Sequence, residues 1–292
     1  MSSDCLLKND HLSLSVAPLG AEMQYLRTSA GDDLLWSGDA TYWTGRAPVL
    51  FPIVGRAPED MIAVGDHTAP MKQHGFARRS VFEVVEQTET MCRHLLTQSD
   101  ETRAVYPFDF DLELAHEIKG ATLHVSAIIR NTGDRPMPFG FGFHPAFRFP
   151  LPHAGSDAHH VTLADASSPD MRKIDDGLLR VEVIESPFTE GDLELRDEMF
   201  AKDALVFPNG ARALRYGPGN TSRKGIALDF EFTNLPDLAL WRPLGAPFLC
   251  IEPWHGTAPY VGDSHQIAER PNSTTLAAGG EARFGYAVTV SA

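Results

Sequence analysis

The residues best suited to chemistry lie in short segments that place proton-carrying side chains beside apolar runs. Glu252 ends the apolar run Phe248–Ile251, and a carboxylate in such a position needs a partner or a function because its burial is costly. Trp254 follows closely and offers a flat face. His144 lies within the aromatic segment Pro138–Phe147, where desolvation is expected to lower the pKa of its imidazole. A neutral imidazole near its pKa can give or take a proton, so both residues are acid–base candidates.

Three further polar residues occupy comparable positions. Arg56 follows an apolar run and a glycine, so its guanidinium is a candidate donor to ligand oxygens. His74 stands beside Gly75, which lets another group approach closely. Asp203 precedes a short apolar run. Every candidate also has a structural interpretation: a surface arginine, a hydrogen-bonded core histidine, a turn aspartate, or a glutamate held by an arginine.

Other kinds of chemistry lack their sequence patterns. The chain has no glycine-rich phosphate loop, no dinucleotide fingerprint and no Gly-x-Ser-x-Gly elbow. Zinc-type spacings such as His-x-His or His-Glu-x-x-His are also missing, so no metal site is predicted. The candidates together indicate metal-free and cofactor-free acid–base chemistry on a polar ligand.

The net charge of the chain limits the partners to be expected, and its cysteines indicate the cellular compartment. The formal net charge of −14 disfavours phosphate backbones and anionic lipid surfaces, so neither a nucleic acid nor a membrane is expected to bind. No run of about 18 apolar residues occurs, and the first residues do not resemble a signal peptide. The three cysteines are odd in number and widely spaced, which favours reduced thiols in a cytoplasmic protein over a disulfide framework.

The elements that must position these residues are predicted to be strands. Apolar and polar residues alternate with a period of two from end to end, which buries one face of a sheet and exposes the other. Few segments show helical periodicity; the candidates for a short helix are Asp39–Trp43 or Glu198–Ala201, and Pro152–Ser168 is expected to be a surface loop. No linker or repeat interrupts the chain, so residues 1–292 are predicted to form one domain. The alternating segments are Leu12–Val16, Phe82–Glu86, Phe108–Leu114, Thr122–Ile128, Ala227–Phe232 and Arg283–Val288.

Five motifs in order resemble the aldose 1-epimerase (galactose mutarotase) superfamily, and most closely its LacX-like branch. The resemblance implies an all-β fold: a galactose mutarotase-like β-sandwich, or supersandwich, of many antiparallel strands with an open sugar-binding cleft. The chain departs from the better-studied galactose mutarotases in having Phe76 after His74-Gly75 and Pro145-Ala146 after His144, which puts the sugar specificity in doubt. The motifs are LFPIVGR (Leu50–Arg56), HGFAR (His74–Arg78), GFHPAF (Gly142–Phe147), DALVF (Asp203–Phe207) and IEPWHG (Ile251–Gly256).

The resemblance implies a role for each matching residue. Glu252 corresponds to the base that takes the proton of the anomeric hydroxyl, and His144 to the acid that protonates the ring oxygen. His74 corresponds to a histidine that binds the sugar near that oxygen, and Asp203 and Arg56 to substrate-binding positions. We add Trp254 as a platform for the sugar ring.

Three functions are compatible with this assignment. The first is a mutarotase that interconverts the α and β anomers of a free aldose and needs no cofactor. The second is a hexose 6-phosphate mutarotase, for which Arg78 or Arg79 would bind the phosphate. The third is a carbohydrate-binding or sensing protein without turnover. The expected partner is a small sugar, and the protein is expected to be a monomer or a homodimer.

Overall fold

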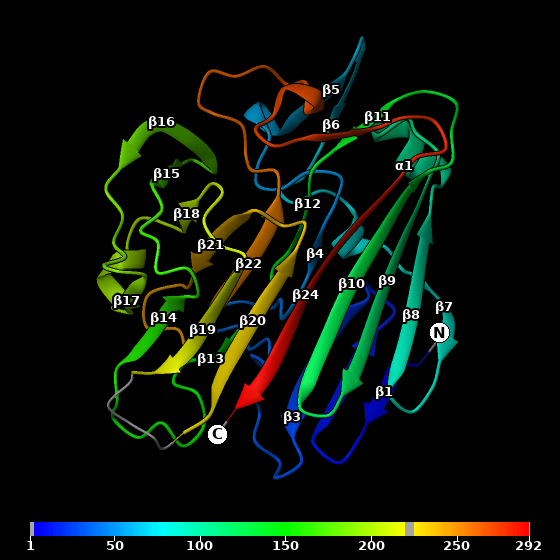
Figure 1. The fold of residues 1–292 in the computed structure, drawn as a ribbon. Coiled ribbons are helices and arrows are strands. Elements are labelled where there is room, and N and C mark those ends of the chain that lie inside the picture. Colours follow the sequence, from blue (N-terminus) through cyan, green and yellow to red (C-terminus); the bar gives the residue numbers. More distant parts are fainter. Residues whose placement is uncertain (1–2, 220–224, 292) are drawn as a thin grey trace.

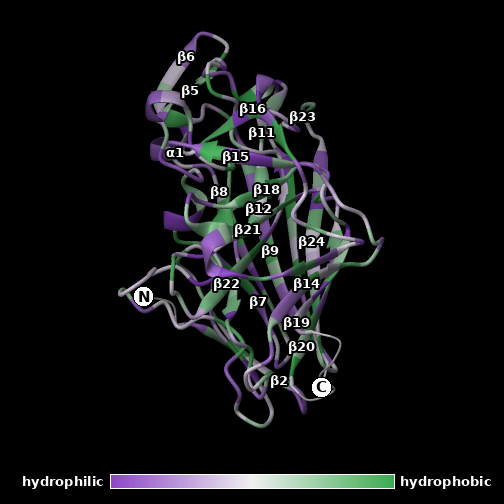
Figure 2. Cartoon of the chain, turned by 90° about the vertical axis from the view of Figure 1, so that its left-hand side faces the viewer, coloured by the Kyte–Doolittle hydropathy of each residue, from purple (hydrophilic) through white to green (hydrophobic). Residues whose placement is uncertain are grey.

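Antiparallel β-sheets make up almost the whole protein in the computed structural model, which describes residues 3–219 and 225–291 (Figure 1). Two large sheets, of nine and eight strands, carry most of the described chain, and three small sheets complete it. Hydrophilic and hydrophobic residues are interleaved along the strands (Figure 2). Strand β9, for example, alternates buried and half-buried residues over nearly its full length. The all-β prediction is confirmed.

The nine-stranded sheet follows the period-two pattern most regularly. Its central strands β9 and β10 pair over their full lengths, and β10 pairs with β24 on its other side. In spatial order its strands are β17 (Asp192–Glu194), β14 (His159–Leu163), β19 (Ala213–Pro218), β20 (Ala227–Thr233), β24 (Glu281–Ser291), β10 (Thr122–Asn131), β9 (Phe110–Lys119), β8 (Met91–Thr97) and β7 (Glu83–Gln87).

The eight-stranded sheet is built around β22, which pairs with three other strands. Its strands are β16 (Leu178–Ile184), β15 (Met171–Asp175), β18 (Leu205–Phe207), β21 (Asp237–Trp241), β22 (Phe248–His255), β12 (Phe141–Phe143) and β4 (Val49–Leu50), with β13 (Ala146–Arg148) also paired to β22.

Three small sheets and several short helices make up the other regular elements of the described chain. None of the helices in the described ranges is long and apolar enough to cross a membrane. The remaining elements are the sheet β1 (Cys5–Lys8), β2 (Leu12–Ala17) and β3 (Glu22–Thr28); the pairs β5 (Met61–Val64) with β6 (His67–Pro70) and β11 (Met137–Phe139) with β23 (Thr274–Leu276); the α-helix α1 (Asp100–Val105); and the 3₁₀ turns Pro58–Asp60, Ala77–Arg79, Asp197–Phe200 and Ile267–Glu269.

Aromatic pairs join the two large sheets across the core. Phe141 of β12 stacks on Phe284 of β24 with ring centroids 5.0 Å apart. Phe147 of β13 meets Phe230 of β20 edge to face at 5.2 Å. Such pairs stabilise a core beyond the apolar area that they bury. The packing fixes one face of the eight-stranded sheet against the nine-stranded sheet and leaves its other face for the site.

Strand β22 shows how this division works. All of its residues except the last are buried, and successive side chains point to opposite faces. Leu249 and Ile251 belong to the main core. Cys250 and Trp254 belong to two separate small clusters, so they lie on the other face, together with Glu252.

Two local predictions were wrong. Pro152–Ser168 is not only a loop, because it contains strand β14, and His159 in that strand is buried. Asp39–Trp43 forms a turn rather than a helix, with the amides of Tyr42 and Trp43 both donating to the Asp39 carbonyl. The helix expected at Glu198–Ala201 is the 3₁₀ turn Asp197–Phe200.

Candidate active site

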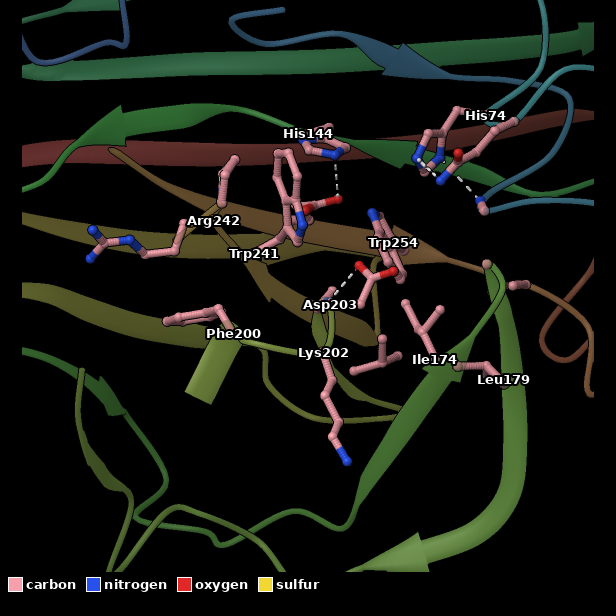
Figure 3. Close-up of a pocket in the computed structure, with 18 of the residues that line it drawn as sticks. His74, His144, Ile174, Leu179, Phe200, Lys202, Asp203, Trp241, Arg242 and Trp254 are labelled. Atoms are coloured by element: carbon pink, nitrogen blue, oxygen red, sulfur yellow. Dashed lines mark hydrogen bonds and ion pairs between the residues drawn. The ribbon is translucent and has the colours of Figure 1, made fainter. Parts of the chain in front are cut away.

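A cavity of about 620 Å³ lies over the face of the eight-stranded sheet that is turned away from the core (Figure 3). Strands β21 and β22, the His144 segment, the β15–β16 hairpin, the His74–Arg78 segment and the residues before β18 contribute to its lining. Six of the seven predicted site residues line this cavity, namely His74, Arg78, His144, Asp203, Glu252 and Trp254.

Glu252 and His144 meet at this cavity. Glu252 comes from the middle of β22 and His144 from the bend between β12 and β13. Nε2 of His144 lies 3.1 Å from Oε2 of Glu252, and both residues are buried, with exposed fractions of 6% and 2%. The structure therefore places the predicted acid and base in direct contact.

Burial acts on the two groups in opposite directions. Desolvation, assisted by the negative charge of Asp203, raises the pKa of the Glu252 carboxyl well above its usual range. Desolvation, assisted by the positive charge of Arg78, lowers the pKa of His144 to about 3. Each shift favours the uncharged form. A proton on Glu252 and a neutral His144 therefore suit the free site, and one proton transfer across their contact converts the pair into carboxylate and imidazolium.

Tryptophans surround the His144 ring. Its centroid lies 4.9 Å from that of Trp43 and 5.8 Å from that of Trp241. The phenylalanines next to it in sequence were expected to supply this apolar setting, but Phe141 and Phe147 lie in the main core. Sequence reasoning missed both tryptophans, because Trp43 lies in a turn and Trp241 ends a strand without a recognisable motif.

His74 is held in one tautomer by the backbone. The amide of Gly55 donates a hydrogen bond to its Nδ1 at 3.1 Å, so the proton of the neutral ring lies on Nε2. Burial keeps the ring neutral by lowering its pKa well below the ordinary value. The ring is 5.5 Å from that of His144 and at right angles to it.

The glycine after His74 has the expected steric role. A side chain at Gly75 would place its Cβ 2.1 Å from the carbonyl oxygen of Phe51, and both His74 and Gly75 have positive φ angles, 65° and 71°. Only glycine tolerates this close approach in that conformation. The tight turn holds His74 beside the cavity.

Arg78 brings a positive charge into the cavity without a committed partner. Its side chain forms no hydrogen bond or ion pair with any residue in the described ranges. Burial lowers its pKa, but a guanidinium keeps its proton near neutral pH. A free, half-buried cation beside Glu252 and His144 is suited to bind ligand oxygens.

Asp203 and Trp254 line the same cavity (Figure 3). Asp203 has a φ of 115°, and its carboxylate accepts a hydrogen bond from the amide of Ala204 at 2.7 Å. Trp254 packs over Gly142, where a Cβ would lie 2.4 Å from the indole ring. Nε1 of Trp254 is buried without a hydrogen bond of normal geometry in the described chain, but it lies close enough to the Glu252 carboxyl to favour its charged form.

Arg56 is the predicted site residue that the structure does not bring to the cavity. Its guanidinium binds Asp60 through Nε at 2.8 Å and Asp176 at 2.6 Å. The neighbouring Gly55 lines the cavity instead. Arg78, which the sequence suggested as a ligand for a substrate phosphate, does line the cavity.

Cys250 is a further group close to the acid–base pair, and sequence analysis did not propose it as a site residue. Cys250 precedes Glu252 by two positions and faces the same side of β22. Its sulfur, a nitrogen of His144 and a carboxylate oxygen of Glu252 all lie within 4.8 Å of one another. Burial raises the pKa of this thiol well above its ordinary value, so it is a neutral neighbour of the acid–base pair.

Comparison with known proteins agrees with this architecture. The aldose 1-epimerase family model matches residues 4–289. The chain is 26% identical to the plasmid LacX protein of Lactococcus lactis subsp. lactis, over 97% of this chain and 98% of that protein. It superposes on a galactose mutarotase related enzyme from Lactobacillus acidophilus with a TM-score of 0.92, at 26% identity and covering 99% and 97% of the two chains. A galactose mutarotase-like protein from Lactobacillus casei gives 0.90, at 26% identity and covering 99% and 100%. The fold is thus galactose mutarotase-like, and the chain belongs to the aldose 1-epimerase family.

Proposed function

We propose that the protein is a mutarotase that opens and recloses the ring of an aldose at C1. The observation that carries this proposal is the contact between Nε2 of His144 and Oε2 of Glu252 in an open cavity. The anomeric hydroxyl and the ring oxygen are both attached to C1, so the groups that exchange protons with them must lie close together. A carboxyl and an imidazole in contact meet this requirement.

Glu252 and His144 each transfer one proton during ring opening and one during ring closure. Ring opening requires the pair in its carboxylate and imidazolium form, which one transfer of the shared proton from Glu252 to His144 supplies. Glu252 takes the proton of the anomeric hydroxyl, and His144 gives its proton to the ring oxygen as the bond from C1 to that oxygen breaks. The aldehyde turns about the C1–C2 bond, and the reverse transfers close the ring on the other face. The pair ends in its starting state, and no cofactor takes part.

The other cavity residues hold the sugar between opening and reclosure. Arg78 and the Nε2–H of His74 donate to its oxygens, and Asp203 accepts from its hydroxyls. Trp254 provides the ring platform. Fixing the open chain in place prevents its escape and saves the entropy of finding it again.

Polarimetry of freshly dissolved α-glucose, α-galactose and other aldoses tests the proposal. The wild-type protein is expected to accelerate the change in optical rotation, and Glu252→Gln is expected to lose about 10²–10⁴-fold, because the amide cannot take the proton. Glu113→Gln is the matched control, since Glu113 lies in the nine-stranded sheet beside Arg93. Full activity in Glu252→Gln would refute the assigned role, and sugar binding without acceleration by the wild type would favour the sensing function.

A second candidate, mutarotation of a hexose 6-phosphate, is favoured by the free guanidinium of Arg78. Lys202 lines the same cavity and adds a second cation. Glucose 6-phosphate is therefore tested beside glucose. A rate enhancement confined to the phosphorylated sugar, and removed by Arg78→Gln, would select this candidate. Equal enhancement of both sugars would reject it.

A further inference from the structure

A second cluster of buried sulfur and nitrogen ligands lies away from the cavity. Cys92 and His94 point from β8 toward the interior, and His116 is the cross-strand partner of Cys92 on β9. Cys5, from strand β1 of the small N-terminal sheet, covers them. All four are buried, with exposed fractions between 0% and 3%. None of them lines the candidate active site.

The distances in this cluster suit a tetrahedral metal ion. Donor atoms of Cys5, Cys92 and His94 all lie within 4.8 Å of one another. Sγ of Cys5 is 3.8 Å from Nε2 of His94. Tetrahedral zinc with ordinary bond lengths sets a sulfur–nitrogen separation of about 3.6 Å. The existing contact is thus close to one edge of such a tetrahedron.

Each of the two imidazoles has one buried nitrogen without a hydrogen-bond partner in the described chain, although Nε2 of His94 contacts the sulfur of Cys5. Nδ1 of His94 and Nδ1 of His116 are both buried without a hydrogen-bond partner in the part of the chain that the structure describes. The rings lie 6.4 Å apart and at right angles. Buried polar atoms normally have partners, so both rings are incompletely satisfied by the protein. In His94 the nitrogen placed to bind a metal is Nε2, beside the Cys5 sulfur, and not the unpartnered Nδ1.

We propose that Cys5, Cys92 and His94, whose donor atoms already lie close together, form a site for a thiophilic divalent cation of the Zn²⁺ class, and that His116 completes it as a Cys₂His₂ site by turning its ring toward them. On binding, the two thiols release their protons to solvent, and Zn²⁺ forms two bonds to thiolate sulfur and two to neutral imidazole nitrogen. The two thiolate charges cancel the charge of the ion. The complex is neutral, which a buried site requires because an uncompensated charge there is costly.

This site would fasten the N-terminal sheet to the nine-stranded sheet. Cys5 is near the start of the chain, in the four-residue strand β1, whereas the other donors lie in strands β8 and β9 of the large sheet. A metal that bridges the two sheets stabilises the folded chain but not the unfolded chain. The site is independent of the proposed mutarotase activity.

The test measures metal binding in the full-length protein after refolding, because the donors are closed to solvent in the folded chain. Reduced, chelator-treated protein is refolded with Co²⁺, and the thiolate-to-cobalt charge-transfer absorption is followed, with Zn²⁺ added to displace cobalt. One equivalent is expected to bind. Cys5→Ala and Cys92→Ala are expected to lose the absorption. Cys250→Ala, which removes the thiol beside Glu252, is the matched control and is expected to keep it.

Two results would overturn the proposal. Loss of the absorption in Cys250→Ala, together with its retention in Cys92→Ala, would place the metal at the cavity. A thiol titration under denaturing conditions without reductant is expected to find all three cysteines free, and only one free thiol would replace the metal site with a Cys5–Cys92 disulfide. Circular dichroism of each variant shows that it is folded, and Zn²⁺ is expected to raise the melting temperature of the wild type and of Cys250→Ala but not of Cys92→Ala.

Discussion

The cavity and the cluster of Cys5, Cys92, His94 and His116, which we call the N-terminal cluster after the sheet that covers it, contain the same kinds of side chain in different surroundings. In each, a buried cysteine and a buried histidine face each other from neighbouring elements. The cavity adds Glu252, the free cation Arg78 and an opening to the ligand. The N-terminal cluster is covered by β1, and among the described residues its group of close donor atoms consists of Cys5, Cys92 and His94, without a carboxylate. The difference indicates that access and neighbouring charge, rather than the cysteine and histidine themselves, distinguish the proposed acid–base site from the proposed metal site.

The largest effect is expected when His144 in the cavity is changed to a residue that cannot carry the proton. His144→Asn is expected to lose about 10²–10⁴-fold in the polarimetric rate while the protein still binds sugar. His94→Asn is the matched variant in the closed cluster, and its rate per folded molecule should equal that of the wild type. Equal losses in the two variants would break the distinction between the regions.

A smaller effect is expected when Arg78, the cation in the cavity, is replaced. Arg56, which lies outside the cavity, provides the comparison. Arg78→Gln is expected to raise KM by about 10- to 100-fold, because a hydrogen bond to a charged group contributes about 1.5–3 kcal/mol. Arg56→Gln is expected to leave KM unchanged within about twofold, because its partners Asp60 and Asp176 lie outside the cavity. Initial-rate polarimetry over a range of sugar concentrations measures both. A larger effect at Arg56 would restore its assignment as a substrate-binding residue.

A milder effect, on stability alone, is expected from a substitution in the N-terminal cluster when no metal is added. Cys92→Ala removes a fully buried sulfur and is expected to lower the free energy of unfolding by about 1 kcal/mol. The mutarotation rate of the folded protein should not change. Denaturant unfolding and polarimetry on the same preparations check the two statements. A lower rate at unchanged stability would show that this cluster acts on the cavity.

The smallest effect is expected from pH. An imidazole with its ordinary pKa of 6.5 changes charge between about pH 5 and 7, but burial lowers the pKa of His144 to about 3, so its protonation in the free enzyme does not change in that range. After subtraction of the solvent reaction, kcat/KM is expected to vary by less than about twofold. At higher pH the rate falls when the pair loses its shared proton, because the pKa of Glu252 is raised. An inflection near pH 6.5 that is absent in His144→Asn would contradict this.

The sequence predicted six residues that line the cavity, because they lie in short segments that each carry a local signal. Glu252 and His144 stand out as polar residues in apolar runs, and the turn at His74 is marked by its glycine. Arg56 shows the limit of such reasoning. Its guanidinium is bound outside the cavity by Asp60, four residues further along the chain, and by Asp176, which is distant in sequence and lies in the β15–β16 turn.

Contacts between distant strands were also beyond reach of sequence reasoning. The cysteines were expected to be unrelated thiols because their spacing fits no motif, yet the folding of β1 over β8 brings Cys5 to Cys92 and His94. The buried strand β14 was missed because its polar residues, among them His160, form hydrogen bonds with Asp192 of the neighbouring strand. Alternation predicts that a strand exists but not which strand lies beside it.

The tryptophans of the protein are concentrated at the cavity, so their fluorescence can be used to follow ligand binding. The chain has four tryptophans. Trp43, Trp241 and Trp254 line the cavity, and the indole of Trp36 donates a hydrogen bond to the carbonyl of Trp43 at 2.8 Å. Intrinsic fluorescence therefore originates at or directly behind the cavity, so a change in emission on titration with a sugar reports occupancy of this region without any label.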